Sequence, residues 1–159
     1  MNEKTKGYTL EEAIKKIEHY CADQDRCHKE VNAKLREMGM IPMAIDKIMG
    51  QLIADRFLNE ERFAKSFARG KFKIKKWGKR RIVNELKFRE VSRFNITTAL
   101  KEIHPQEYLD TLDSLAKKRL GQLKEPNVQK RKKKLADYLL YRGWESHLVY
   151  EKLTELIPK

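Results

Sequence analysis

Apolar residues recur at three- and four-residue spacings along nearly the whole chain, which is the pattern of helices that bury one face. Only seven glycines and four prolines interrupt this pattern, and no convincing strand is found. The sequence therefore predicts an all-α fold. Pro42 and Pro105 fall near proposed helix starts, and Gly39, Gly78 and Gly143 sit where helices are expected to stop or turn.

Thr9 and Glu12, three residues later, have the spacing of a capping box and predict the start of the first helix. Ala13, Ile17 and Cys21 then follow on one side of the helix. Cys21 is accordingly expected to be a small buried apolar residue, with the helix ending within the next few residues.

Asn59 can cap a second, long helix that carries the most aromatic stripe of the chain. The stripe expected to be buried is made of Phe63, Phe67, Gly70, Ile74 and Trp77. On the other side of the same helix lie five basic residues, Lys65, Arg69, Lys73, Lys76 and Arg80.

The chain also contains an internal repeat, because residues 30–53, 81–104 and 134–157 align without gaps. Six apolar positions coincide in the three segments: Val31, Leu35, Met40, Ile45, Met49 and Leu52; Ile82, Leu86, Val91, Ile96, Leu100 and Ile103; Leu135, Leu139, Trp144, Val149, Leu153 and Leu156. Each segment reads as helix, turn, helix, with a further helix before it. The sequence thus predicts three tandem three-helix repeats, at 1–55, 56–104 and 105–159. The alternative is chance agreement between amphipathic helices.

Charge is concentrated in the middle of the chain. Lys and Arg number 36 against 23 Asp and Glu, which gives a net charge of +13. Residues 1–55 hold nine basic and ten acidic side chains, residues 56–104 hold 15 and five, and residues 105–159 hold 12 and eight. A field of this sign and density attracts polyanions. The alternative, a merely solubilising face, does not explain why the first third has no surplus.

The basic residues expected to contact nucleic acid fall in two groups. They are Lys65, Arg69, Lys73, Lys76, Lys79, Arg80, Arg81 and Lys87 in the middle third, and Lys130, Arg131, Lys132, Lys133 and Lys134 in the last third. Such contacts would be made to phosphates of single- and double-stranded DNA, without reading base edges, and would weaken with salt. Trp77 and Trp144 could stack on bases, but packing in the core is the favoured interpretation for both.

Catalytic and metal-binding patterns are not apparent. The sequence contains no P-loop, GxGxxG, HExxH or CxxC motif. His19, Cys21, Cys27 and His28 resemble a zinc ligand set in type, but His19 and Cys21 point to different sides of a helix. We therefore expect a protein that is not an enzyme and that holds neither a metal nor a cofactor.

The stretches without a charge run to only seven or eight residues, far short of the roughly 20 that span a bilayer. The start of the chain has no apolar segment of the kind found in signal peptides. These observations predict a cytoplasmic protein without a membrane partner, in which both cysteines stay reduced. No obvious dimerisation segment is present, so a monomer is expected.

The segment LNEERFAKSFARGKFKIKKWGKRRIVNELKFREV, residues 58–91, resembles the most recognisable block of the RecX family, the bacterial modulators of the RecA recombinase. Residues 21–35 and 135–149 are similar to the first and third units of that family. The resemblance implies three tandem three-helix units in an elongated, curved body. It also implies a protein that binds along the groove of the RecA filament, antagonises recombination and takes part in DNA repair and the SOS response.

The chain departs from the family pattern at several positions. Asp23 and Gln24 stand where a basic pair is common, and Cys27 stands where a serine cap is usual. Glu90 replaces a small residue, often glycine, so that turn cannot rely on the tolerance of glycine for positive φ.

Two other function classes stay open on the sequence alone. Helix-turn-helix units in a basic chain could form a DNA-binding transcription regulator. A basic, helical chain could also be a structural RNA-binding protein.

Overall fold

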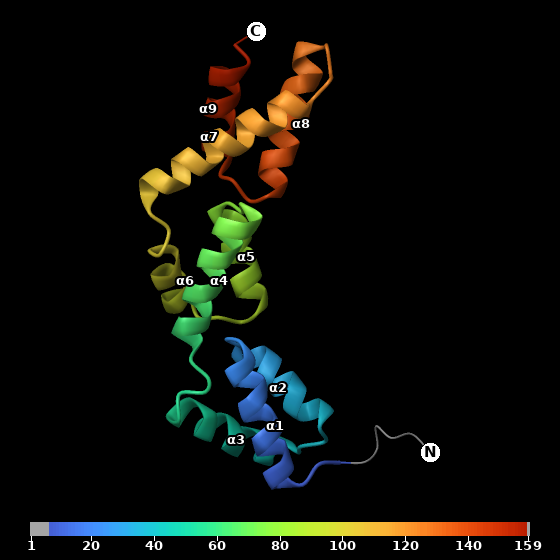
Figure 1. Cartoon of the computed structure of the whole chain (residues 1–159), viewed down its shortest axis with the longest axis vertical. Coiled ribbons are helices and arrows are strands. Elements are labelled where there is room, and N and C mark those ends of the chain that lie inside the picture. Colours follow the sequence, from blue (N-terminus) through green and yellow to red (C-terminus); the bar gives the residue numbers. More distant parts are fainter. Residues whose placement is uncertain (1–6, 159) are drawn as a thin grey trace, which may run out of the picture. The chain divides into compact units, whose positions relative to one another are not determined.

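The computed structural model describes residues 7–158, which form nine α-helices and no strand (Figure 1). The helices are α1 (Leu10–Asp23), α2 (His28–Glu37), α3 (Pro42–Ala54), α4 (Glu60–Lys75), α5 (Lys79–Phe88), α6 (Arg93–Leu100), α7 (Pro105–Gln122), α8 (Val128–Tyr141) and α9 (Ser146–Leu156). The all-α prediction is confirmed.

The chain divides into two compact units that are described separately. The first runs up to Ser66 and also contains Leu86–Ile96, and the second contains Phe67–Glu85 and the residues from Thr97 onward. The division passes through α4, α5 and α6, so the predicted middle repeat contributes to both units. The repeat boundaries near residues 55 and 104 stay a prediction.

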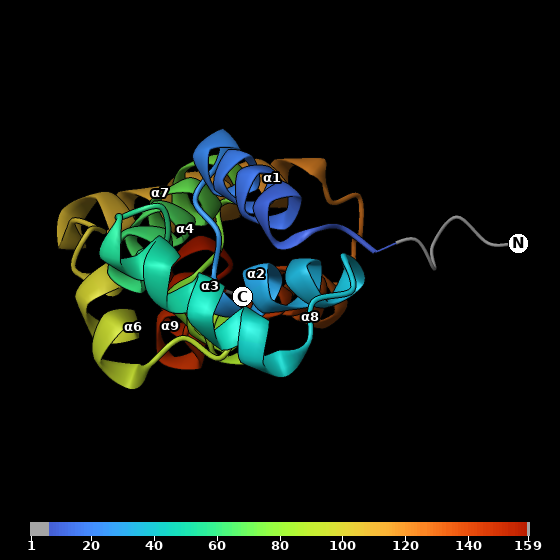
Figure 2. The same ribbon diagram turned by 90° about the horizontal axis from the view of Figure 1, so that it is seen from below.

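The first unit is built around α1, α2 and α3, which pack on one another in pairs; Figure 2 views the same three helices from below. The predicted capping box is present, since the Thr9 hydroxyl accepts a hydrogen bond from the Glu12 N–H and the Glu12 carboxylate accepts one from the Thr9 N–H. The core of this unit consists of Ala13, Ile17, Cys21, Val31, Leu35, Met38, Ile45, Ile48, Leu52 and Leu58. The buried stripe that ends in Cys21 is thus confirmed.

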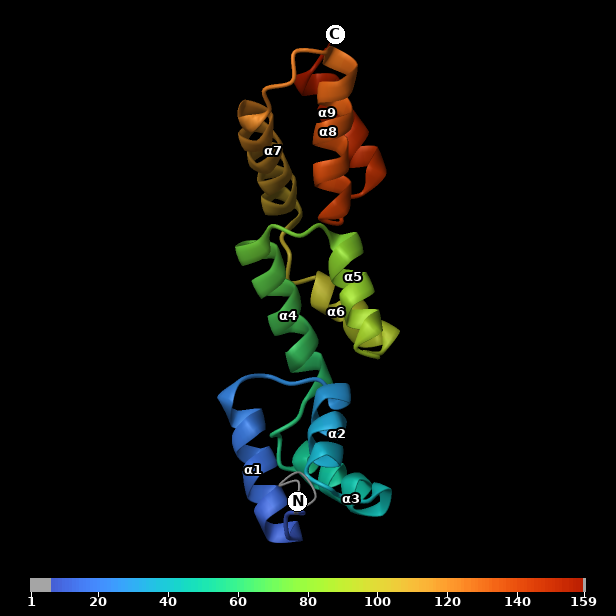
Figure 3. The same ribbon diagram turned by 90° about the vertical axis from the view of Figure 1, so that its right-hand side faces the viewer.

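The second unit contains α7, α8 and α9, which also pack in pairs, as Figure 3 shows. Its core contains a cluster of three aromatic rings among aliphatic residues. The Tyr108 ring stacks on Trp144 with centroids 4.5 Å apart and lies 5.8 Å from Phe72. Trp144 is fully buried, and its indole N–H donates a 3.1 Å hydrogen bond to the Lys76 carbonyl. The predicted core position of Trp144 is therefore confirmed.

The same turn joins the last two helices of each predicted repeat. In all three turns the N–H of one residue bonds to the carbonyl five residues earlier, at Met40 to Leu35 (3.1 Å), Val91 to Leu86 (3.1 Å) and Trp144 to Leu139 (3.2 Å). The residue before each donor, Gly39, Glu90 or Gly143, has a positive φ of 84°, 60° or 91°. This geometry is a Schellman cap. Glu90 adopts the left-handed conformation although a Cβ atom makes it costly.

Two glycines bring α5 and α8 together within the second unit. The Gly78 N–H donates to the Arg142 carbonyl at 2.8 Å, and the Arg80 N–H donates to the Gly143 carbonyl at 3.0 Å. A methyl group on Gly78 would overlap the Gly143 carbonyl, and one on Gly143 would overlap the Cβ and N of Arg81. Backbone therefore lies against backbone, an approach that only glycine permits.

The buried face of α4 differs from the predicted one. Ala64, Ala68 and Phe72 are buried together with Phe63, whereas Ile74 is 78% exposed. The helix ends at Lys75, so Trp77 lies in the following turn and Arg80 in α5. The prediction was wrong for two reasons. It extended the helix through this turn, and it assigned the buried face to the aromatic residues rather than to the face that contains Ala64 and Ala68.

The corrected face of α4 can be tested with two apolar residues that lie two positions apart. Phe72→Ala should lower the free energy of unfolding by about 3 to 5 kcal/mol, because it removes a buried ring and leaves a cavity. Ile74→Ala, the matched control, should change it by no more than about 0.5 kcal/mol. Urea unfolding followed by circular dichroism measures both, and similar costs for the two variants would contradict this assignment of the face.

The backbone contact between the two glycines gives a second prediction. Gly78→Ala should lower the free energy of unfolding by about 1 to 3 kcal/mol, since the added methyl has nowhere to go. Gly70→Ala is the control, because a methyl there meets nothing within 4 Å. In the interior of α4 that substitution should stabilise the protein by up to about 1 kcal/mol. Opposite signs in thermal unfolding are the expected result, and a stabilising Gly78→Ala would exclude the close contact.

Candidate nucleic-acid interface

The thirteen basic residues predicted to contact nucleic acid all lie at least partly on the surface. Lys65, Arg69 and Lys73 belong to α4, Lys76 to the turn after it, Lys79, Arg80, Arg81 and Lys87 to α5, and Lys130, Arg131, Lys132, Lys133 and Lys134 to the first half of α8. Lys65 and Lys87 belong to the first compact unit and the other eleven to the second. Their role in binding stays a prediction.

Four of these cations already have a carboxylate partner. The pairs are Lys65 with Glu61 at 3.5 Å, Arg69 with Glu102 at 2.7 Å, Lys133 with Asp137 at 2.9 Å and Lys134 with Glu125 at 3.2 Å. Exposed pairs of this kind contribute little to stability. They do, however, reduce the positive charge that a phosphate would meet.

The other nine predicted residues form no ion pair within residues 7–158: Lys73, Lys76, Lys79, Arg80, Arg81, Lys87, Lys130, Arg131 and Lys132. Six of them lie between residues 73 and 87. Most of the predicted cations without a carboxylate partner among residues 7–158 therefore lie at the end of α4, in the turn that follows and in α5.

The turn between α4 and α5 is held by hydrogen bonds of its backbone to α4, to the Lys76 side chain and to Tyr108 of α7. Lys76 has a positive φ of 58°, and its ammonium group donates to the Lys73 carbonyl at 2.8 Å. The Trp77 N–H donates to the Lys71 carbonyl at 3.2 Å, and the Lys79 N–H donates to the Tyr108 hydroxyl at 2.8 Å. The cations of this turn are thus presented from a fixed backbone.

Aromatic rings lie among these cations. Trp77 is half-buried, with the Lys71 ammonium 5.0 Å and the Arg81 guanidinium 4.2 Å from its ring centre. The Lys79 ammonium lies 4.7 Å from the ring centre of Tyr108. Lys71 is a member of this cluster that the sequence did not single out. Its position four residues after Phe67, on one helix face, was the available signal.

Tyr108 stays neutral beneath this surface. Its hydroxyl donates a short hydrogen bond to the Glu145 carboxylate, and burial followed by this bond raises the pKa of Tyr108 well above its usual range. Glu145 is the N-cap residue of α9, but its side chain makes no capping hydrogen bond there, so its carboxylate is engaged by Tyr108 instead.

The basic run of α8 is compensated in part. Glu125 accepts hydrogen bonds from the Asn127 N–H and from Lys134, which together lower the pKa of the Glu125 carboxyl. A hydrogen bond to Asp137 raises the pKa of Lys133. Arg131 donates to the Glu125 carbonyl at 3.3 Å. This run is therefore a weaker anion site than its sequence indicates.

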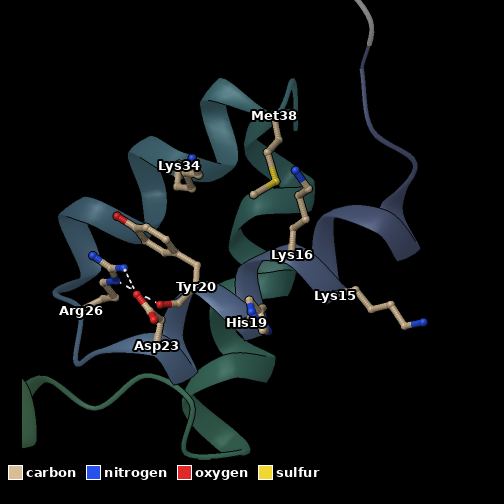
Figure 4. Close-up of a pocket in the computed structure, with 8 residues that line it drawn as sticks. All are labelled: Lys15, Lys16, His19, Tyr20, Asp23, Arg26, Lys34 and Met38. Atoms are coloured by element: carbon tan, nitrogen blue, oxygen red, sulfur yellow. Dashed lines mark hydrogen bonds and ion pairs between the residues drawn. The ribbon is translucent and has the colours of Figure 1, made fainter.

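The first unit contains a groove that the sequence did not predict, with a volume of about 580 Å³ (Figure 4). It is lined by Lys15, Lys16, His19, Tyr20, Asp23, Arg26, Lys34 and Met38. Most of its cations are engaged: Arg26 contacts Asp23 at 3.5 Å and the Tyr20 ring at 3.7 Å, Lys34 contacts Glu37 at 3.8 Å, and Lys16 donates to Tyr8 at 3.1 Å. Figure 4 shows Lys15 pointing away from the groove.

No group of three or more histidine, cysteine, aspartate or glutamate side chains within residues 7–158 is placed to hold a metal ion. Cys21 and Cys27 are buried free thiols, and burial raises the pKa of Cys27 to about 11. Both sulfurs are therefore protonated near neutral pH. None of the helices in the described part of the chain is both long and apolar enough to cross a membrane.

Two family models match the chain. The model of the second three-helix domain of RecX matches residues 59–100, and the model of the third matches residues 106–153, together more than half of the chain. All thirteen predicted site residues lie inside these two segments.

Curated relatives called regulatory protein RecX are also similar. One from Oceanobacillus iheyensis is 25% identical over 89% of this chain and 52% of its own length, and one from Bacillus cytotoxicus is 26% identical over 86% and 51%. One from Prosthecochloris aestuarii is 26% identical over 91% of this chain and 93% of its own. The chain thus spans about half the length of the first two relatives and nearly all of the third.

Solved structures share the fold. A crystal structure described as RecX from Lactobacillus salivarius has a TM-score of 0.80 at 21% identity, covering 92% of this chain and 96% of that one. Another described as regulatory protein RecX has a TM-score of 0.82 at 20% identity, covering 92% and 73%. These similarities confirm three-helix domains of this type.

Cations without a carboxylate partner and cations with one should contribute differently to the salt dependence of DNA affinity. We define the open set as Lys73, Lys79, Arg80 and Lys87, and the compensated set as Lys65, Arg69, Lys133 and Lys134. Replacing the open set with glutamine should flatten the slope of log affinity against log salt by about 0.9 for each lost duplex contact and about 0.7 on single strands.

The same four changes in the compensated set remove equal charge, yet should flatten the slope by less than half as much. Fluorescence anisotropy with a labelled oligonucleotide at several salt concentrations measures both sets. Equal slopes for the two variants would mean that ion pairs do not decide which cations meet phosphate.

Proposed function

The chain belongs to the RecX family, and on that premise we propose that it is a non-enzymatic regulator that binds the RecA nucleoprotein filament and limits filament growth. Inhibition of the recombinase, ATPase and coprotease activities of RecA would follow from that binding. The observation that carries the proposal is the coincidence of two features in one region. The segments that match the RecX models are also those that hold every predicted cation of the interface.

The proposed mechanism is a shift between filament states rather than a chemical step. A protein that acts only by binding can change such an equilibrium by as much as its affinities for the two states differ. Repeated three-helix units offer several contacts to successive protomers of a filament. Weak contacts on one chain reinforce one another through effective concentration, so the assembled filament should be preferred to free RecA.

The open set supports a contact with DNA phosphates inside the filament. Lys73 and Arg80 are exposed, and neither is tied to a carboxylate of the described chain. The nearly neutral first third of the sequence would then contribute shape and protein contacts rather than charge. Binding to DNA in this proposal is independent of sequence and decreases with salt.

A charge-reversal experiment tests the proposed function. Lys73, Lys79, Arg80 and Lys87 are all changed to Glu, and inhibition of the DNA-dependent ATPase and of strand exchange is measured with RecA on single-stranded DNA. We expect the variant to lose inhibition at least tenfold while it keeps the circular dichroism spectrum of the unmodified chain, because none of the four side chains is buried and only Lys79 lies over a core ring, that of Tyr108.

The matched control changes Lys15, Lys47, Lys101 and Lys124 to Glu, which alters net charge by the same amount at exposed positions. It should retain most of the inhibition. Equal loss in both variants would show that only net charge matters. If the unmodified chain left both RecA activities unchanged across a range of salt, the proposal would be wrong, and specific binding to one operator would then favour a transcription regulator.

A further inference from the structure

Two exposed aromatic residues occupy the same position in the second and third repeats. Phe88 is the last residue of α5, Tyr141 is the last residue of α8, and the two coincide in the repeat alignment. Phe88 is 68% exposed and Tyr141 is 73% exposed. Glu37, the last residue of α2, takes the same position in the first repeat. A single exposed ring is common on protein surfaces, so the feature of interest is that two rings take the same position and, as follows, the same contacts.

Each ring is held by a cation from the beginning of the preceding repeat's second helix. In the first unit the Lys29 ammonium lies 4.3 Å from the Phe88 ring centre and donates to the Phe88 carbonyl at 2.9 Å. In the second unit the Arg81 guanidinium lies 4.9 Å from the Tyr141 ring centre and donates to the Tyr141 carbonyl at 3.4 Å. The same pair of contacts, to ring and to carbonyl, is thus built twice.

The cation occupies only part of each ring, since about two thirds or more of each residue stays accessible. A structural role at the end of the helix accounts for the carbonyl contact and the occupied face. It does not account for an exposed ring that is fixed in place. An exposed aromatic ring with a cation over one face can stack on a flat partner through the other.

The surroundings of both rings favour an anionic partner. Lys87 precedes Phe88 in the sequence, the Arg81 guanidinium lies against the Tyr141 ring, and the Arg80 backbone is bonded to Gly143 just after α8. Two carboxylates lie nearby, but Glu90 contacts Lys29 at 3.9 Å and Asp137 contacts Lys133 at 2.9 Å. A partner that offers both flat rings and negative charge is a nucleic acid. Its bases are accessible for stacking only when the strand is single.

We propose that Phe88, in the first unit, and Tyr141, in the second, each stack on a base of single-stranded nucleic acid, while the neighbouring cations contact phosphates. The proposal rests on the nucleic-acid part of the proposed function and adds to it a preference for single strands over duplex. Stacking on a ring is tolerant of sequence, because every base has a π-face. The two residues therefore contribute affinity without selecting a sequence.

The test measures binding of the complete chain to labelled oligo(dT) in the absence of any recombinase, at one fixed salt concentration. Tyr141→Ala and Phe88→Ala should each weaken binding about 5- to 100-fold. Tyr141→Phe should stay within about twofold of the unmodified chain, because the ring is kept. Tyr150→Ala is the matched control, since Tyr150 is a tyrosine that is 55% exposed on another helix, α9.

Three further measurements separate stacking from other roles. The slope against salt should not change in the alanine variants, because phosphate contacts are kept. An abasic strand of equal length should bind the unmodified chain and the alanine variants equally well. Duplex DNA of equal length should also bind the unmodified chain and the alanine variants equally well. Phe88→Leu, which keeps apolar bulk without an aromatic ring, replaces Phe88→Ala if the latter unfolds, and should also weaken oligo(dT) binding.

The proposal is overturned if the alanine variants bind oligo(dT) as Tyr150→Ala does, or if they lose the same affinity on abasic strands. It is also overturned if the unmodified chain does not bind the bare strand, or if the rings affect only the RecA filament, which would make them protein contacts. Because the strand assay contains no RecA, its failure leaves the inhibition test intact, and failure of the inhibition test leaves the strand result intact.

Discussion

The contact between Gly78 and Gly143 is the constraint on which the arrangement of the second unit depends. Two turns lie backbone to backbone because neither residue carries a Cβ atom, and two hydrogen bonds, Gly78 N–H to Arg142 and Arg80 N–H to Gly143, join them directly. This contact fixes the start of α5 against the end of α8. Arg81 consequently reaches the carbonyl and the ring of Tyr141, and Trp144 reaches the Lys76 carbonyl. Packing of two helix ends and presentation of cations are thus consequences of one steric condition.

Much of the fold could be predicted because it is determined locally. The capping box at Thr9, the start of α3 at Pro42 and the three equivalent turns all depend on residues within five positions of one another. The turn at Glu90 shows how far tertiary packing can override local preference. Its φ of 60° is the conformation that glycine adopts easily, yet the buried residues on both sides, Leu86 and Val91, keep the turn in the shared geometry.

The structural features that the sequence analysis missed depend on contacts between residues that are distant in the sequence. The alternative stripe of α4 contains Ala64 and Ala68, whose small side chains carry little hydrophobic signal although both are fully buried. Their burial depends on what packs against α4 in the folded chain, which periodicity does not report. The glycine contact was likewise invisible, since Gly78 and Gly143 are far apart in sequence and each reads simply as a turn residue. The candidate site shares this property, because the partners of Arg69 and Lys134 could not be identified by counting charges.

Charge density and charge availability therefore have to be separated in a basic protein of this kind. The five consecutive cations of α8 form the densest run in the sequence, but Glu125 and Asp137 engage two of them, and Arg131 is turned toward a carbonyl. The cations on either side of the turn between α4 and α5 are more available, since Lys73 at the end of α4 and Arg80 at the start of α5 have no carboxylate partner among the described residues. A phosphate that approaches α8 must compete with an existing carboxylate. At the end of α4 and the start of α5 it displaces only water and counterions. Affinity should therefore follow the open cations of α4 and α5, with the exposed rings at the ends of α5 and α8 adding a contribution that salt does not screen.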